Sequence, residues 1–404
     1  IDKSSLQTVS VWPMPNRFSV PMPGGSAFQG HFFPIGLPGE LRGYSLLEMA
    51  EREPVWRRRP PEIAKLNATP SIGPGGPEFV VFQIRNHLIV CDPSDGAVLW
   101  QRSDLPADSG MYADPAAGIS GDESCLTVFE QDRVKYTVYD TFSGRVLRRG
   151  ELENESRPPR RPFGRKLHCV WQVRGQWEAR VWDPLANRWE FVEPLAERNY
   201  LAQQVIGSGE LMWLTADARL KAYDVQNSRE TLNATFQAED LEGLSALRVV
   251  NDGPRTYVNI QRHSPPVQTR DYNNAFRDVP VAGLTIRDDL YAIDRETQRV
   301  LWKRTVPFRT LLKLEPAGLP FLVLLSQIRD ARENNPLSLL VEVIDADTGD
   351  LIARRDKLPL DPSAPIIRHA EYDGVDQKVR VLFQRMTVEI ELSPHASPFH
   401  APTE

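Results

Sequence analysis

Seven acidic side chains, set at similar intervals along the chain, are the residues whose type and spacing first suggest a chemical role. Each ends a short run of alternating apolar residues and begins a polar turn. A carboxylate at the end of a strand accepts hydrogen bonds from backbone N–H groups two or three residues later, which forms an Asx turn. The pattern therefore predicts a structural rather than a catalytic role. The seven residues are Glu48, Asp92, Asp140, Asp183, Asp224, Asp294 and Asp345.

Two further positions recur relative to these acidic residues. Four residues later lie Gly96, Gly144, Asn187, Ser228, Gln298 and Gly349. A hairpin closed by a G1 bulge needs a left-handed residue there, which Gly supplies freely and Asn tolerates. Ser228 and Gln298 fit less well, so a different turn is expected in their repeats. Eight residues after the acidic position, Trp56, Trp100 and Trp302 recur, and we expect them to close the seams between neighbouring repeats.

The residue types that most often carry catalysis show no comparable order. The seven histidines are scattered, and none has the HxH or HExxH spacing of a metal site. Cys91, Cys125 and Cys169 lie far apart and are expected to be small buried side chains, with one disulfide as the alternative. No GxSxG or phosphate-binding loop occurs. We therefore predict no catalytic, cofactor-binding or metal-binding residues.

The runs before the acidic residues have the period of β-strands. Residues two and four positions before each acidic residue are mostly apolar, while the position between them is mixed. A period of two indicates a strand with one buried face. A second strand precedes each run, and successive acidic residues lie 44, 48, 43, 41, 70 and 51 positions apart. Repeats of this length with four strands are typical of a β-propeller blade.

The repeats predict an all-β fold, an eight-bladed β-propeller of four-stranded antiparallel blades, with seven blades as the alternative. Seven repeats are clear between residues 44 and 355, and a partial one covers residues 379–392. The lone alternating strand at residues 6–12 is expected to share that last blade, so that strands from both ends of the chain close the ring. Residues 1–404 then form one domain, with a disordered tail at residues 393–404.

The pattern "LYAIDRETQRVLW", from Leu290 to Trp302, resembles the repeat of quinoprotein-like (PQQ-like) β-propellers, and "LIVCDPSDGAVLW" is similar. That family includes quinoprotein alcohol and sugar dehydrogenases. It also includes non-catalytic scaffolds, such as the propeller lipoprotein of the outer-membrane β-barrel assembly machinery. The alcohol dehydrogenases have two adjacent cysteines beside the quinone, and this chain has none. The resemblance implies a propeller and an extracytoplasmic location, in the periplasm or cell envelope.

The 70-residue interval before Asp294 contains an insertion, at about residues 263–287. Loops of this length in a compact fold are usually functional or mobile. We interpret it as a partner-binding element, with a solvated insertion and a small-molecule lid as alternatives. A shorter insertion follows in the next repeat, at residues 328–338. The predicted binding residues are Arg270, Asp271, Tyr272, Asn273, Phe276 and Arg277.

Composition narrows the possible partners. The net charge of −6 disfavours nucleic acid and anionic membranes. No apolar run of about 18 residues occurs, so no membrane span is expected. Two basic runs, at residues 57–59 and 157–166, are interpreted as solvated loops, with a site for an acidic partner as the alternative. The chain begins without Met, so it is expected to be processed or part of a longer chain.

These observations favour a non-catalytic binding or scaffold propeller that presents loops to a protein or cell-envelope component. One alternative is a PQQ- or Ca²⁺-dependent quinoprotein dehydrogenase, which predicts convergent Asp, Arg and Lys side chains at the ring centre. A second alternative is a carbohydrate-binding propeller. The sequence leaves the partner and the oligomeric state open.

Overall fold

The computed structural model consists almost entirely of β-strands. It describes residues 6–13, 32–37, 39–45, 54–66, 70–105, 119–130, 134–152, 160–197, 200–206, 209–262, 272–274, 283–329, 338–360, 367–383 and 386–392. Within these ranges α1 (Pro61–Leu66) is the one α-helix. The chain divides into two compact units. Unit 1 is Ile1–Val20, Ala196–Tyr223 and Glu230–Glu404, and unit 2 is Pro21–Leu195 and Asp224–Arg229.

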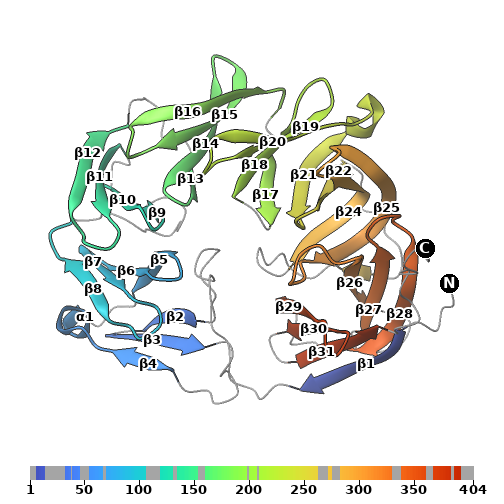
Figure 1. Ribbon diagram of the computed structural model, residues 1–404, viewed down its shortest axis with the longest axis horizontal. Coiled ribbons are helices and arrows are strands. Elements are labelled where there is room, and N and C mark those ends of the chain that lie inside the picture. Colours follow the sequence, from blue (N-terminus) through green and yellow to red (C-terminus); the bar gives the residue numbers. More distant parts are fainter. Residues whose placement is uncertain are drawn as a thin grey trace, which may run out of the picture. The chain divides into compact units, whose positions relative to one another are not determined.

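Unit 2 is built of antiparallel sheets whose strands follow one another in chain order (Figure 1). Three sheets have four strands, namely β5–β8, β9–β12 and β13–β16, and one has three, β2–β4. The strands are β2 (Phe32–Leu37), β3 (Glu40–Ser45), β4 (Trp56–Arg58), β5 (Ser71–Gly75), β6 (Val80–Ile84), β7 (His87–Cys91), β8 (Val98–Arg102), β9 (Ile119–Gly121), β10 (Cys125–Phe129), β11 (Lys135–Asp140), β12 (Val146–Glu151), β13 (Arg160–Phe163), β14 (Lys166–Val173), β15 (Gln176–Asp183) and β16 (Arg188–Leu195).

Unit 1 contains a three-stranded sheet β18–β20, a four-stranded sheet β1-β31-β30-β29, and a nine-stranded sheet that joins successive repeats. Its strands are β1 (Leu6–Pro13), β17 (Ala202–Ile206), β18 (Glu210–Leu214), β19 (Arg219–Asp224), β20 (Arg229–Thr235), β21 (Leu244–Asn251), β22 (Arg255–Arg262), β23 (Tyr272–Asn274), β24 (Gly283–Asp294), β25 (Arg299–Leu312), β26 (Phe321–Arg329), β27 (Ser338–Asp345), β28 (Leu351–Pro359), β29 (Ile367–Asp373), β30 (Lys378–Phe383) and β31 (Met386–Leu392).

The fold is thus all-β, with four-stranded antiparallel blades of the β-propeller type. Five such blades are complete in the described ranges: β5–β8, β9–β12, β13–β16, β21-β22-β24-β25 and β29-β30-β31-β1. The prediction of eight four-stranded blades, or of seven, is therefore wrong for this part of the chain. One cause is β17, which pairs in parallel with β21 and so leaves β18–β20 with three strands. Another is β25, which continues from one repeat into the next and fuses their sheets.

The sharing of one sheet by the two ends of the chain is confirmed. β1 pairs antiparallel with β31, with Val9 opposite Ile390 and Val11 opposite Val388. Figure 1 shows β1, in dark blue, beside β31, in red. The sheet edge that β31 would otherwise expose is therefore covered by a strand from the opposite end of the sequence.

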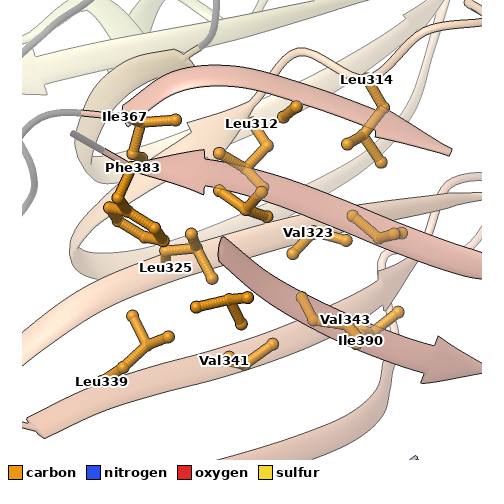
Figure 2. Packing of buried hydrophobic residues seen from close by; sticks show 14 of the residues in the cluster. Leu312, Leu314, Val323, Leu325, Leu339, Val341, Val343, Ile367, Phe383 and Ile390 are labelled. Carbon is orange, nitrogen blue, oxygen red and sulfur yellow. The ribbon is translucent and has the colours of Figure 1, made fainter. Parts of the chain in front are cut away.

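The alternating apolar residues form the core, as the period of two predicts. Val341 and Val343 on β27 are buried, and they pack with Val323 and Leu325 on β26 and with Ile390 on β31. Figure 2 shows these side chains pointing into the layer between adjacent sheets of unit 1. Burial of such aliphatic side chains stabilises the fold by about 1.5–3 kcal/mol each.

The turns after the acidic residues share one geometry. Asp140 Oδ1 accepts a hydrogen bond from the N–H of Ser143 at 2.8 Å, and Asp345 Oδ1 accepts one from the N–H of Thr348 at 2.8 Å. The residues four positions on are all left-handed, with φ of 73° at Gly96, 65° at Gly144, 53° at Asn187, 54° at Ser228, 57° at Gln298 and 75° at Gly349. The expectation of a different conformation at Ser228 and Gln298 is therefore wrong. The turn at Glu48 lies outside the described residues.

The recurring tryptophans cover the glycines of the following repeat's turn. Trp56 Nε1 donates to Pro93 O at 2.8 Å, Trp100 Nε1 to Thr141 O at 2.7 Å, and Trp302 Nε1 to Ala346 O at 2.9 Å. A Cβ atom added to Gly96, Gly144 or Gly349 would lie 2.5–2.7 Å from the ring of the tryptophan above it. Each indole therefore joins two repeats and requires glycine in the second.

An arginine two residues after each tryptophan completes this contact. Arg58 Nε, Arg102 Nη1 and Arg304 Nη1 donate to the carbonyl oxygens of Gly96, Gly144 and Gly349, at 3.3, 3.4 and 2.7 Å. The sequence analysis missed these arginines, although the spacing Trp-x-Arg occurs in all three repeats. Arg58 belongs to the basic run at residues 57–59, which is exposed as interpreted from the sequence, and it also contacts the next repeat.

The three cysteines are buried thiols that form no disulfide with one another, and each is less than 2 % exposed. Desolvation by burial raises the pKa of Cys91 to about 12 and that of Cys125 to about 11. Such thiols are poor nucleophiles because they stay protonated at neutral pH. No helix in the described ranges is long and apolar enough to cross a membrane.

Candidate functional site: an insertion with an anchored base

The long insertion of unit 1 lies between β22 and β24, in the connection that its sequence interval indicates. Of the predicted binding residues, Tyr272 and Asn273 lie on the short strand β23. The other four, Arg270, Asp271, Phe276 and Arg277, lie outside the described residues. The site is therefore built from β23 and from the strand ends at which the insertion begins and returns.

β23 is held by a strand of the next repeat. It pairs antiparallel with β26, with Tyr272 opposite Arg329 and Asn274 opposite Gln327. This position on β26 is open because β25 pairs with β26 only at Leu324 and Leu325. The insertion of one repeat thus continues the sheet of its neighbour, which fixes the backbone of at least three insertion residues.

The second, shorter insertion leaves the fold beside β23. It follows β26 directly, and its two ends are joined by the pairing of Ile328 with Ser338, whose Oγ donates to Ile328 O at 3.4 Å. Residues 330–337 themselves lie outside the described part. Because Tyr272 is opposite Arg329, the register of β23 places the two insertions next to each other.

Asn259 forms the base of the long insertion. It is fully buried on β22, and its Nδ2 donates to Arg287 O at 2.6 Å and to Asp289 O at 3.0 Å on β24. Its Oδ1 accepts from Arg287 N at 3.3 Å and from Gln261 Nε2 at 3.0 Å. A buried amide with all of its groups in use rigidifies its surroundings. It therefore fixes the strand on which the insertion returns.

The strand that Asn259 supports contains a bulge. The register of β24 against β25 shifts between Ile286 and Asp288, and Asp288 has a φ of 63°. The Asp288 carboxylate accepts a hydrogen bond from the N–H of Arg262 at 2.9 Å, which stabilises the left-handed backbone. Bulges are common beside functional sites, where they re-aim a side chain. Here the bulge turns Arg287 to a half-exposed position at the insertion's base.

A second layer of charges lies beneath the bulge. Asp289, buried on β24, pairs with Arg262 at 2.7 Å and with Lys303 at 3.1 Å, and it accepts from Thr305 Oγ1 at 2.8 Å. Burial alone would raise the pKa of Asp289, but the hydrogen bonds from Arg262, Thr305 and Lys303 outweigh it and hold the pKa below its usual range. Lys303 also pairs with Asp240 at 2.6 Å. The charges are thus used internally and tie β22, β24 and β25 together.

Other buried charges are likewise paired within their own unit. Lys166, 3 % exposed, donates to Val225 O at 2.7 Å and pairs with Glu190 at 2.6 Å in unit 2. The interpretation of its basic run as a solvated loop is therefore wrong at this residue. In unit 1, Glu210 pairs with Arg295 at 2.6 Å. No group of His, Cys, Asp and Glu in the described part of the chain is arranged to hold a metal ion.

Sequence reasoning located the insertion but missed its base. Asn259, Asp288 and Asp289 belong to no repeated position, because only this repeat has a long connection to support. An Asn and a Gln on the inward face of β22, at Asn259 and Gln261, interrupt an otherwise apolar strand pattern. Buried polar residues of this kind are hydrogen-bonded in native proteins, so they were the one available signal.

Comparisons with known proteins add little to this geometry. No family model matches the chain, and no curated protein matches its sequence. Among solved structures, BamB from Moraxella catarrhalis is 12% identical over 92% of this chain and 94% of its own, with a TM-score of 0.42. The WD40 domain of SCAP from fission yeast is 12% identical over 96% and 99%, with a TM-score of 0.47. The C-terminal WD40 domain of Sif2 is 10% identical over 90% and 92%, with a TM-score of 0.41.

These likenesses are too distant to carry an argument about function. The assignment to blades of the β-propeller type rests on the strand pairing itself. The resemblance of the repeats to quinoprotein-like propellers stays a prediction, since no family model matches.

Proposed function

We propose that this protein is a non-catalytic binding protein that captures a protein or cell-envelope partner through the insertion between β22 and β24. The observation that carries the proposal is the double anchoring of that insertion. Asn259 and Asp288 fix its base, and β23 is paired with β26 of the next repeat. A solvated loop without a role needs neither contact.

Anchoring favours binding for an energetic reason. A loop that becomes ordered on binding loses conformational entropy, which subtracts from the affinity. Pairing of β23 with β26 orders part of the insertion before any partner arrives. Rigid elements also hold contact residues in place better than free loops do. The flanking segments with Arg270, Phe276 and Arg277 then supply an aromatic side chain and guanidinium groups, which are enriched among residues that dominate binding energy.

The proposal also includes the compartment in which the protein acts. We infer an extracytoplasmic site of action, in the periplasm or cell envelope, from the resemblance of the repeats to quinoprotein-like propellers. No cofactor is required for the proposed role. The propeller scaffold suits it because blades form a stable frame while their connecting loops vary.

The test is a triple substitution that spares the anchors. Arg270→Glu, Phe276→Ala and Arg277→Glu together leave β23 and Asn259 intact. The matched control, Arg149→Glu, Val375→Ala and Arg299→Glu, changes three exposed residues with the same total change of charge. Each protein is immobilised, and the amount of the partner that it captures is compared with the amount captured by the unmodified chain.

We expect the insertion variant to bind at least about tenfold more weakly, which corresponds to about 1.4 kcal/mol, with an unchanged thermal midpoint. The control variant should bind like the unmodified chain. Equal capture by both variants would show that the insertion is not the binding element.

A further inference from the structure

A small crevice in unit 1 lies apart from the insertion, at the contact between two successive repeats. Its wall is formed by the turn after β21, by β22, and by the segment that leads from β25 into β26. The crevice has a cavity volume of about 10 Å³. The apolar part of the wall includes Leu312, Leu319 and Phe321, and the polar part consists of Asp252, Tyr257 and Lys313.

Tyr257 brings a buried hydroxyl group to this crevice. The side chain is 1% exposed, and its Oη has no hydrogen-bond partner within the described structure. A buried hydroxyl without a partner is costly, and native proteins rarely contain one. The ring itself is well packed, with its centroid 6.2 Å from that of Trp302. The packing thus accounts for the ring of Tyr257 but not for its hydroxyl group.

Asp252 brings a half-buried carboxylate to the same space. Its Oδ1 accepts a hydrogen bond from Gly318 N at 3.0 Å, and no bond to its second oxygen occurs within the described structure. Desolvation raises the pKa of this group above its usual value. The neighbouring Arg255 also lies close to the Tyr257 hydroxyl, but its guanidinium group pairs with Asp347 and donates to Leu319 O at 3.3 Å.

We infer that the crevice binds one water molecule, which accepts a hydrogen bond from Tyr257 Oη and donates one to the Asp252 carboxylate. A single water needs a cavity of roughly 10–15 Å³ and two to four polar partners. The crevice meets both conditions, since Asp252 and Tyr257 are polar residues on its wall and its volume is about 10 Å³. The water connects Asp252 and Tyr257, which belong to the same β21–β22 hairpin. Gly318 of the next repeat contacts this hairpin through its hydrogen bond to Asp252, so the water lies where the two repeats meet.

The experiment compares two tyrosines of which only one lines the crevice. Tyr257→Phe removes the hydroxyl at the crevice. Tyr136→Phe is the control, because Tyr136 Oη is also buried without a hydrogen-bond partner within the described structure, but Tyr136 is not among the residues that line the crevice. Native-state hydrogen exchange of the amides in β22 and in β11 reports the local opening equilibrium in each variant.

We expect Tyr257→Phe to lower the protection of β22 amides by about three- to tenfold, the usual net effect of losing one hydrogen bond. Tyr136→Phe should leave the protection of β11 unchanged or raise it. Unchanged or increased protection in Tyr257→Phe would overturn the inference, as would an equal loss in both variants. A crystal structure of the unmodified chain should show density between Tyr257 Oη and Asp252, and its absence would also contradict the water site.

Discussion

The pairing of Trp100 with Gly144 allows a quantitative test of how neighbouring repeats are joined. Gly144 has a φ of 65°, and a Cβ atom at this position would lie 2.6 Å from the indole ring of Trp100. Gly144→Ala therefore introduces two separate costs. The left-handed backbone costs a residue with a Cβ about 1–2 kcal/mol, and overpacking against the ring costs a further 1–3 kcal/mol.

The two costs separate in a double-mutant cycle. In the Trp100→Ala background the ring is absent, so Gly144→Ala should then cost only the backbone amount, about 1–2 kcal/mol. The coupling free energy between the two substitutions is therefore expected to be about 1–3 kcal/mol. Its sign is such that the double variant is destabilised by less than the sum of the two single variants. Trp100→Ala alone also loses the 2.7 Å hydrogen bond to Thr141 O.

Asn187→Ala is the matched control for the backbone cost. Asn187 has a φ of 53° at the same position of its turn, and the preceding repeat has Arg148 in place of tryptophan. Its substitution should cost about 1 kcal/mol or less, since Asn itself is not free of strain there. Hydrogen exchange in β11, β12 and β15 is the appropriate assay, because it reports the local stability of the strands beside each turn.

The reasoning would be refuted by either of two results. If Gly144→Ala costs the same with and without Trp100, the ring does not impose the glycine. If Gly144→Ala costs no more than Asn187→Ala, the contact at the ring has no energetic consequence and the tryptophan is not a seam residue.

Three further predictions address the base of the insertion, the turns after the acidic residues and the expectation that no quinone cofactor binds. Asn259→Ala should destabilise the β22–β24 base by about 1–3 kcal/mol, because it removes the buried hydrogen bonds to the carbonyls of Arg287 and Asp289; hydrogen exchange should show the loss in β24 and not in β30. The pKa of Asp140 is lowered by hydrogen bonds from the Ser143 side chain and N–H, so its contribution to stability is complete above the ordinary pKa of 3.8 and is lost as pH falls through the lower folded value. Asp140→Asn should therefore lose less thermal stability between about pH 5 and pH 3 than the unmodified chain. Calorimetric titration with pyrroloquinoline quinone, with and without Ca²⁺, should give no saturable heat, and micromolar binding would favour the dehydrogenase alternative.

Local features of the fold could be predicted because they depend on short sequence patterns. The Asx turn at Asp140 and the left-handed glycine at Gly144 lie within five consecutive residues. Alternation predicted the buried face of β11, where Tyr136 and Val138 are buried, and the pattern at residues 6–12 predicted the strand that pairs with β31. In each case the physical cause, a side-chain hydrogen bond or the pleat of a strand, acts over a few residues.

The number of four-stranded blades depends on pairing between distant segments, which the repeat alone does not determine. β17 pairs with β21 and leaves β18–β20 with three strands, while β23 takes part of the edge of β26. Similarly, Asn259 contacts Arg287 across 28 residues of sequence. Which sheet edge such a strand pairs with depends on packing between distant segments. The sequence of a single repeat carries no signal for that packing.

Site-specific photocrosslinking tests the proposed function most directly. A photoreactive amino acid is placed at Phe276 in the insertion, and in a separate chain at Val375, which is 93% exposed on the turn between β29 and β30. The account predicts one defined adduct from position 276, which excess unmodified chain suppresses, and none from position 375. Adducts from position 375 alone, or equal and unsuppressed labelling from both, would contradict the assignment of the insertion as the binding element.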